Sequence, residues 1–182
     1  MQSKAPNSAW VQDALPSNLE KLAYAKMQAG DVKGALADNE QALQIRGELA
    51  AKSPADAAIQ RALALDLLWL GDIRLKAGDT SGAQPVYQEG LDLMREGAGE
   101  PGQRDVSDAL QRLAGAKEQA ADWSGAGAAY QENLEIWRDI ASKHKDDASI
   151  QHDLINALVN AALAAIEAGQ DCLLYTSDAA DE

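Results

Sequence analysis

The stretch that decides the fold is a short corner, Ala77-Gly78-Asp79-Thr80-Ser81-Gly82-Ala83, which lies between two segments of helical periodicity. Glycine readily adopts the left-handed conformation that ends many helices, so Gly78 is expected to terminate the helix before it. The carboxylate of Asp79 can then accept a hydrogen bond from a backbone N–H in the first turn of the next helix. We therefore interpret the stretch as a tight helix–turn–helix corner.

The same corner recurs along the chain, and its spacing indicates an internal repeat. The residue that ends the first helix falls at Gly30, Gly78, Ala121 and Gly169, at intervals of 48, 43 and 48 residues. A Gly-Ala pair follows the first three corners, at Gly34-Ala35, Gly82-Ala83 and Gly125-Ala126. The chain is therefore predicted to contain several copies of one helix pair.

The segments between corners carry apolar residues at the 3.6-residue period of amphipathic helices, and not at the period of two that strands show. Alanine and leucine dominate the apolar residues, and phenylalanine is absent. We expect first helices near 10–29, 59–77, 103–121 and 150–169. We expect second helices near 32–51, 80–97 and 124–143. Pro16 lies within the first of these helices, where it either kinks the helix or marks its start.

These features together predict an all-α fold, an α-α solenoid of about 3.5 repeats with seven helices. One repeat domain is expected over residues 1–171. Its units span about 7–54, 55–100, 101–147 and 148–171, the last of them truncated. The segment 172–182 breaks every upstream pattern and resembles the conceptual translation of a transposase adapter used in sequencing libraries. We expect a non-native tail there; the alternative is a natural acidic tail.

The pair Leu70-Gly71, together with Ala83, Tyr87 and the corner between them, resembles the tetratricopeptide repeat, or TPR. The resemblance covers about residues 7–171, although the units exceed the usual 34 residues. Asn133 stands where the second unit has Gly90, which suggests looser packing in the third unit. The resemblance implies a scaffold that binds a protein or peptide on a concave helical surface and is not an enzyme.

The long units are similar to arrays in large bacterial proteins, so the alternative is a regulatory or sensor segment of a signalling enzyme. Its kinase, protease or ATPase domain would lie outside this chain. In the TPR family, the first helix of each pair lines the concave face. The polar and aromatic residues there that lie off the apolar stripe are our candidate partner-binding residues: Lys21, Tyr24, Trp69, Asp72, Lys76, Arg112, Asn156 and Asn160.

Two of these candidates have alternatives. Trp69 equally suits a packing role between neighbouring units. Co-chaperone TPR proteins hold a peptide carboxylate on these helices, but of the matching places only Arg112 fits, so that role is not expected.

A row of cations at Lys26, Arg74 and Lys117 either lines a groove for an acidic ligand or serves the helix ends, where a cation suits the dipole. We favour the second interpretation.

Catalytic and metal-binding motifs are not evident. His144 and His152 lie near aspartates at a helix junction, but we expect solvated surface residues there. The single cysteine, Cys172, falls in the expected tail, so it supports neither a disulfide nor a thiol nucleophile. The sequence contains no glycine-rich phosphate loop and no nucleophile elbow. We therefore expect no cofactor and no metal.

Charge limits the partners further. Acidic residues outnumber basic ones 29 to 16, and the net charge of -13 disfavours nucleic acid. No apolar stretch is long enough for a membrane span, and no signal peptide is evident, so a cytoplasmic location is expected. We also expect Val159, Leu163 and Ile166 to leave an apolar strip at the C-terminal end, through which the fragment self-associates.

Overall fold

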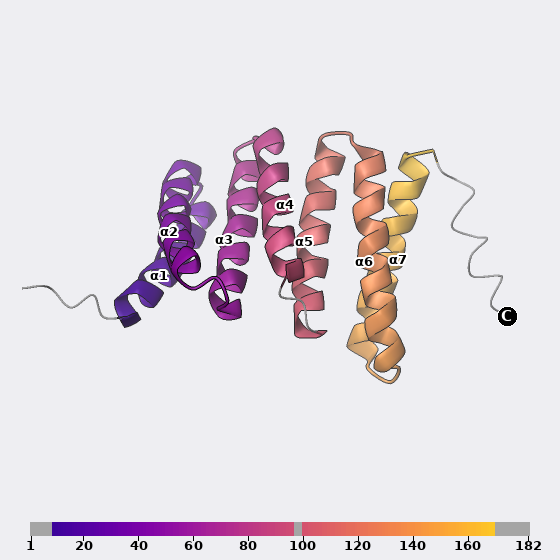
Figure 1. Ribbon diagram of the computed structural model, residues 1–182. Helices are drawn as coiled ribbons and strands as arrows, with labels where there is room; N and C mark the ends of the chain where they lie inside the picture. Colours follow the sequence, from indigo (N-terminus) through magenta and orange to yellow (C-terminus); the bar gives the residue numbers. More distant parts are fainter. Residues whose placement is uncertain (1–8, 97–99, 170–182) are drawn as a thin grey trace, which may run out of the picture. The chain divides into compact units, whose positions relative to one another are not determined.

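The computed structural model describes residues 9–96 and 100–169, and the predicted tail at 172–182 lies outside this part (Figure 1). The described residues form seven α-helices and no strand, which confirms the all-α prediction. The first helices are α1 (Ala9–Gln28), α3 (Ala57–Lys76), α5 (Glu100–Gln119) and α7 (Ala148–Glu167). The second helices are α2 (Val32–Lys52), α4 (Thr80–Glu96) and α6 (Trp123–Lys143).

The helices begin and end close to the expected residues, with α5 showing the largest difference. It begins at Glu100, three residues before the expected start at 103. Pro16 lies inside α1 and therefore does not mark the start of that helix. Pro85 is the sixth residue of α4, past the first-turn N–H groups that lack an intrahelical partner, so the Ser81 carbonyl is left without its usual donor four residues later.

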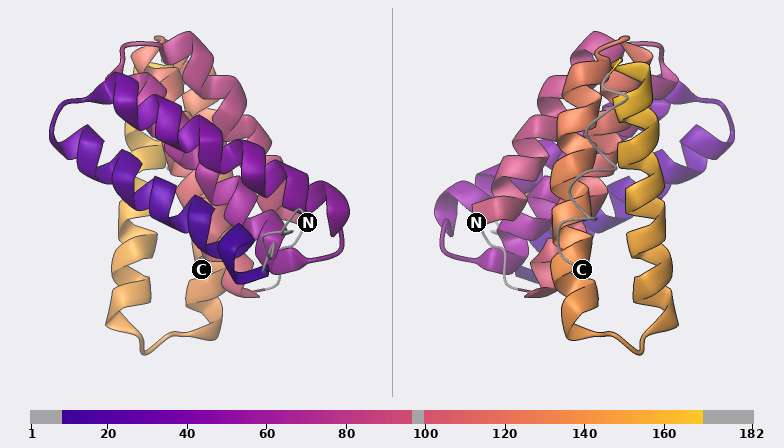
Figure 2. Two further views of the ribbon diagram at one scale, coloured as in Figure 1. Left: turned by 90° about the vertical axis from the view of Figure 1, so that its left-hand side faces the viewer. Right: turned by 90° about the vertical axis from the view of Figure 1, so that its right-hand side faces the viewer.

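The chain forms two compact units, Met1–Gly97 and Ala98–Glu182. Within the first unit, α1 packs on α2, α2 on α3, and α3 on α4. Within the second unit, α5 packs on α6 and α6 on α7. Figure 2 shows α1 beside α2 in its left view and α6 beside α7 in its right view. The larger grouping of residues 1–171 into one domain of four repeats remains a prediction.

Each corner is a helix end closed by a left-handed residue. Gly30 and Gly78 both have φ of 82°, Gly169 has 72°, and Ala121 adopts the same region with φ of 58°. At the second corner, the N–H of Asp79 donates to the carbonyl of Arg74, and the N–H of Gly78 donates to that of Leu75. This pair of bonds is the Schellman motif, which satisfies carbonyls at the end of α3.

The aspartate of each corner caps the next helix and explains the glycine three residues later. The carboxylate of Asp79 accepts a 2.9 Å hydrogen bond from the backbone N–H of Gly82. A Cβ added to Gly82 would lie 2.0 Å from the Asp79 Oδ2 atom, so a larger residue there would require the capping carboxylate to shift. Asp31 and Asp122 cap α2 and α6 in the same way. The corner motif is therefore set by capping geometry.

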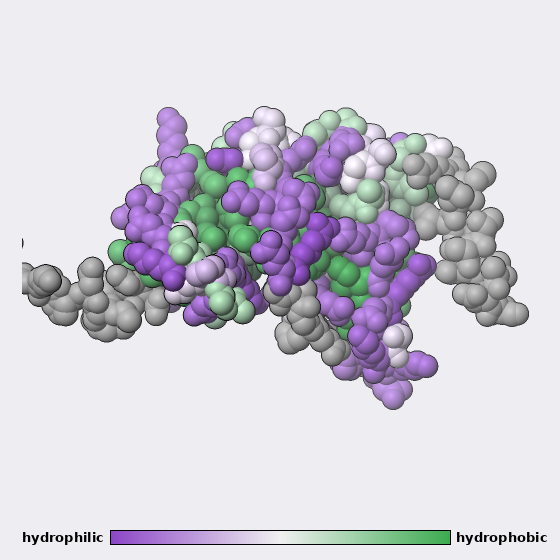
Figure 3. All heavy atoms as spheres, viewed as in Figure 1, coloured by the Kyte–Doolittle hydropathy of each residue, from purple (hydrophilic) through white to green (hydrophobic). Residues whose placement is uncertain are grey.

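The core of the α3–α4 pair places a large side chain against a small one. Tyr87 of α4 is fully buried, and its ring occupies the space that a Cβ on Gly71 of α3 would need. Neighbouring pairs meet where Leu67 and Leu70 of α3 pack with Leu43 of α2. Figure 3 shows hydrophilic residues over much of one face, with apolar residues between them. These contacts are the packing expected for TPR-like helix pairs.

Candidate protein-interaction surface

Two candidate residues, Tyr24 of α1 and Trp69 of α3, form an aromatic pair. Their ring centroids lie 5.7 Å apart, and the ring planes meet at 80°, which is an edge-to-face arrangement. Tyr24 is 50% exposed, and Trp69 is partly buried. The pair therefore joins the first helices of two successive repeats and still presents aromatic surface to solvent.

Two exposed lysines flank this pair along the helices. Lys21 lies one turn before Tyr24 on α1, and Lys76 lies two turns after Trp69 on α3. Lys21 therefore lies toward the start of α1 from the aromatic pair, and Lys76 lies toward the end of α3. We call Lys21, Tyr24, Trp69 and Lys76 the α1–α3 surface.

The other candidates have different surroundings. The carboxylate of Asp72 accepts a 2.7 Å hydrogen bond from the Tyr87 hydroxyl, so this residue supports the α3–α4 pair. Arg112 of α5 forms a 3.0 Å ion pair with Asp108 one turn earlier. Asn156 is exposed and Asn160 is half-buried on α7. Arg112, Asn156 and Asn160 belong to the second compact unit.

The row of cations connects the two helices of each corner. Lys26 forms a 2.5 Å ion pair with Asp38 of α2. Arg74 donates a 2.8 Å hydrogen bond to the backbone carbonyl of Gly82 in α4. The ammonium of Lys117 lies 3.3 Å from the capping carboxylate of Asp122. The pKa of Asp122 is lowered first by the hydrogen bond from the Gly125 N–H and then by the one from Lys117. The structure thus favours the structural role for these cations over a ligand groove.

A buried ionic cluster, which sequence analysis did not identify, joins the first three helices. Arg46 of α2 forms ion pairs with Asp66 of α3 and with Glu20 of α1. Its guanidinium also donates to the Ser17 hydroxyl at 3.3 Å. Asp66 is completely buried, and its Oδ1 atom has no hydrogen-bond partner in the described residues. One cation therefore faces two carboxylates in the core of the first unit.

The excess of carboxylates over cations in this cluster affects the pKa of Asp66. Burial is the largest influence on Asp66, and it raises the pKa of its carboxyl to about 7. The charge of Arg46 opposes this rise, while the nearby Glu20 carboxylate adds to it. Burial alone would lower the pKa of Arg46, but Asp66 and Glu20 raise it above its ordinary value. The cluster can therefore take up a proton near neutral pH while Arg46 stays charged.

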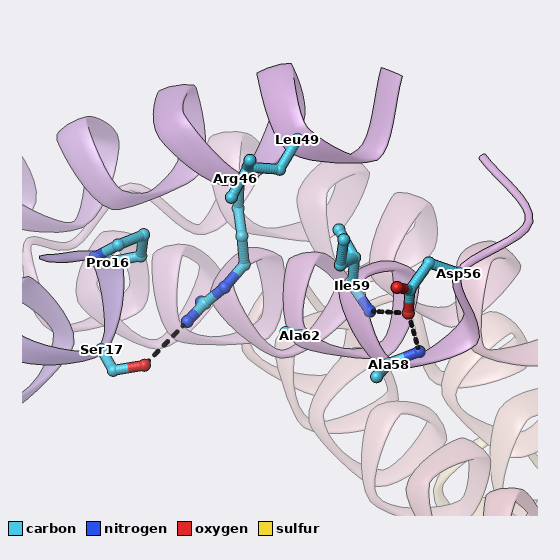
Figure 4. Close-up of a pocket in the computed structure, with 8 residues that line it drawn as sticks. All are labelled: Pro16, Ser17, Arg46, Leu49, Asp56, Ala58, Ile59 and Ala62. Carbon is cyan, nitrogen blue, oxygen red and sulfur yellow. Dashed lines mark hydrogen bonds between the residues drawn. The ribbon is translucent and has the colours of Figure 1, made fainter. Parts of the chain in front are cut away.

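A pocket of about 340 Å³ lies beside this cluster, between α1, the end of α2 and the start of α3 (Figure 4). Leu49 and Ile59 contribute apolar surface, and Ser17 and Arg46 face one another across it. Asp56 also lines the pocket, but its carboxylate caps α3 through the N–H groups of Ala58 and Ile59. The polar groups are thus already used by the fold, and the pocket offers no free cation for an anionic ligand.

Within 9–96 and 100–169, no group of three or more His, Cys, Asp or Glu residues is arranged to hold a metal ion. His144 is the residue that follows α6, and His152 is exposed on α7. None of the described helices is long and apolar enough to cross a membrane.

No protein-family model and no curated protein matches the sequence. Among solved structures, BtubC (BKLC) from P. vanneervenii is similar, with a TM-score of 0.69 and 17% identity. The similarity covers 92% of this chain but only 61% of BtubC, so the chain spans about three fifths of that protein.

Two structures of nearly identical TPR-like repeats are also similar; both come from a Podosopora anserina protein assigned as a kinesin light chain. One is a single-residue variant with a TM-score of 0.53 and 15% identity, covering 88% of this chain and 89% of its own. The other has a TM-score of 0.50 and 14% identity, and the similarity covers 85% of this chain and 87% of that one. At these identities the comparisons show the fold alone. The chain is an α-α solenoid of TPR-like helix pairs.

Proposed function

We propose that this protein is a scaffold that binds a partner protein or peptide on the face formed by its first helices. The observation that carries the proposal is the exposed Tyr24–Trp69 pair between two lysines. Aromatic side chains are the most frequent energetic anchors of protein interfaces, because they bury much area with few rotatable bonds. TPR-like repeats, the fold of the similar structures, are typical of protein-protein interaction.

The partner's chemistry follows from the groups on the α1–α3 surface. Within the described part of the chain, neither the Trp69 indole N–H nor the Tyr24 hydroxyl has a protein hydrogen-bond partner, so both can donate to a ligand. Lys21 and Lys76 add positive charge on a protein whose net charge is -13. An acidic peptide with an apolar or aromatic anchor is the ligand that this surface fits.

We also propose Arg112 of α5 and Asn156 and Asn160 of α7 as partner-binding residues of the second unit. A cytoplasmic location and the absence of nucleic-acid binding belong to the same proposal, the latter because the net charge of the chain is negative. No catalytic step is assigned to any residue.

The proposal can be tested by selecting displayed random peptides on the full chain. We expect the enriched peptides to be acidic and to contain an aromatic or large apolar residue. Tyr24→Ser should abolish the enrichment. Leu22→Ser is the matched control, because Leu22 is also on α1, is 47% exposed and lies off this surface. Equal enrichment on both variants, or no enrichment on the natural chain, would contradict the proposal.

A further inference from the structure

Helix α7 carries an exposed apolar strip on the side away from α6. Ile155 is 56% exposed, Val159 49%, Leu163 56% and Ile166 58%. Their spacing places them on one face over about 16 Å of helix, at roughly 1.5 Å per residue. No charged residue lies between Ile155 and Ile166. A strip of this kind on a folded helix marks a surface that another element covers.

The repeat shows what covers this face elsewhere in the chain. Ala64 and Leu68 of α3 take the places of Ile155 and Val159, and both are buried. They lie against α4, because a Cβ on Gly90 would lie 3.1 Å from the Ala64 carbonyl oxygen and 3.1 Å from Leu68 Cδ2.

In the pair formed by α5 and α6, the equivalent face of α5 is likewise covered by its second helix. Ser107 of α5 takes the place of Ile155, and its hydroxyl accepts a 2.8 Å hydrogen bond from the Trp137 indole of α6. Both residues are buried. The face that α7 leaves exposed is therefore the one on which α3 and α5 each carry a second helix.

We propose that the α7 strip is a docking site for an amphipathic helix of a partner protein, antiparallel to α7 as α4 is to α3. Ala162 takes the place of Gly71 in α3 and of Ala114 in α5. A Cβ on Gly71 would lie 2.3 Å from the Tyr87 ring, so a large side chain of the partner helix has to lie farther from Ala162 than Tyr87 lies from Gly71. Val159 takes the place of Leu68, so the partner helix needs a small residue opposite it, as Gly90 is in α4.

The sequence led us to expect self-association through this strip, but a second copy of the chain suits it less well than a partner helix. Two α7 strips would bring four large side chains of each copy against four of the other, whereas helices pack closely when ridges enter grooves. Two copies would also bring together chains that each carry a net charge of -13. The strip therefore fits a helix with small central residues better than it fits another α7.

The test uses the full chain and a fluorescein-labelled peptide of the α4 sequence, Thr80–Glu96, with capped ends. Fluorescence anisotropy should show saturable binding, which a scrambled peptide of the same composition lacks. Leu163→Glu should weaken binding at least tenfold. Leu22→Glu is the matched control, because this exposed leucine lies on α1, and it should leave binding unchanged. A peptide carrying Gly90→Leu should bind at least tenfold more weakly.

Two outcomes would overturn the proposal. The first is the absence of peptide binding, or binding that Leu163→Glu does not affect. The second is a dimer of the free chain in light scattering that Leu163→Glu converts to monomer, because this would assign the strip to a second copy. Neither outcome bears on the α1–α3 surface, which lies in the other compact unit.

Discussion

The guanidinium of Arg46 in α2 and the carboxylate of Asp66 in α3 form an ion pair inside the first unit, where Asp66 is completely buried. The pair joins the end of one repeat to the first helix of the next. The same places in the following helices hold Met94 in α4 and Ala109 in α5, both buried. Arg46 and Asp66 thus stand at positions where later helices carry buried apolar residues.

This relationship predicts the effect of removing either partner. Arg46→Met should lower the free energy of unfolding by about 3 kcal/mol, because Asp66 would remain buried without its cation. The double variant Arg46→Met, Asp66→Ala, which copies the residues of the later helices, should recover most of that loss. Urea denaturation measures both values. A single variant within about 0.5 kcal/mol of the natural chain would show that the pair contributes little.

The pH dependence of stability follows from the same carboxyl. Because the folded state raises the pKa of Asp66 to about 7, the folded chain holds a proton there that the unfolded chain has released. This contribution to stability is complete below about pH 4, the unfolded value, and is lost as the pH rises toward about 7. Between these limits its slope is at most about 1.4 kcal/mol per pH unit.

The measurement compares the natural chain with Asp66→Asn, which cannot titrate. The free energy of unfolding of the natural chain should fall relative to the variant as the pH rises from 5 to 7. Arg46 and Glu20 are unchanged in the variant, so the comparison changes only the carboxyl of Asp66. A difference that is constant with pH, or that grows in favour of the natural chain, would contradict the assignment.

The backbone at the third corner is strained at Ala121, and a substitution can relieve that strain. Ala121 has φ of 58°, where the other corners have glycine. Ala121→Gly should therefore stabilise the chain by about 1 kcal/mol, because glycine adopts this conformation without the steric cost of a Cβ. Thermal denaturation gives the value. Ala120→Gly, one residue earlier and at the right-handed position of the corner, should be neutral or destabilising.

A buried amide in α6 gives a further prediction. Asn133 is completely buried, and neither its Nδ2 nor its Oδ1 atom has a hydrogen-bond partner in the described residues. Asn133→Ala should raise the free energy of unfolding by about 1 to 2 kcal/mol, because two unpaired polar atoms leave the core. Asn156→Ala, at an exposed position of α7, should change it by less than about 0.5 kcal/mol. A destabilised Asn133→Ala chain would indicate an unseen partner for the amide.

Local chemistry explains why sequence analysis predicted the helices and corners well. Gly78 and Asp79 determine the end of one helix and the cap of the next, and these effects act within a few residues. The exposure of Val159, Leu163 and Ile166 was likewise predictable, because helical periodicity separates them from the face that packs on α6.

The Arg46–Asp66 pair could not be predicted by the same reasoning, because it joins residues 20 positions apart on different helices. A signal was present, since both charged residues stand where the later repeats have apolar ones. Tyr24 and Trp69 were each identified as candidates, but their contact depends on how α1 and α3 lie across α2. The two interpretations of Trp69 are compatible, because it packs between repeats and stays partly exposed.

The central claim, that the α1–α3 surface binds an acidic partner segment, is tested most directly by the affinity of one selected peptide for three full-length chains. Fluorescence anisotropy would compare the natural chain, Trp69→Leu and the control Leu22→Ser. We predict that Trp69→Leu weakens binding at least tenfold, as loss of a central aromatic anchor does, and that Leu22→Ser binds as the natural chain does. Equal affinity of the natural chain and Trp69→Leu would contradict the account.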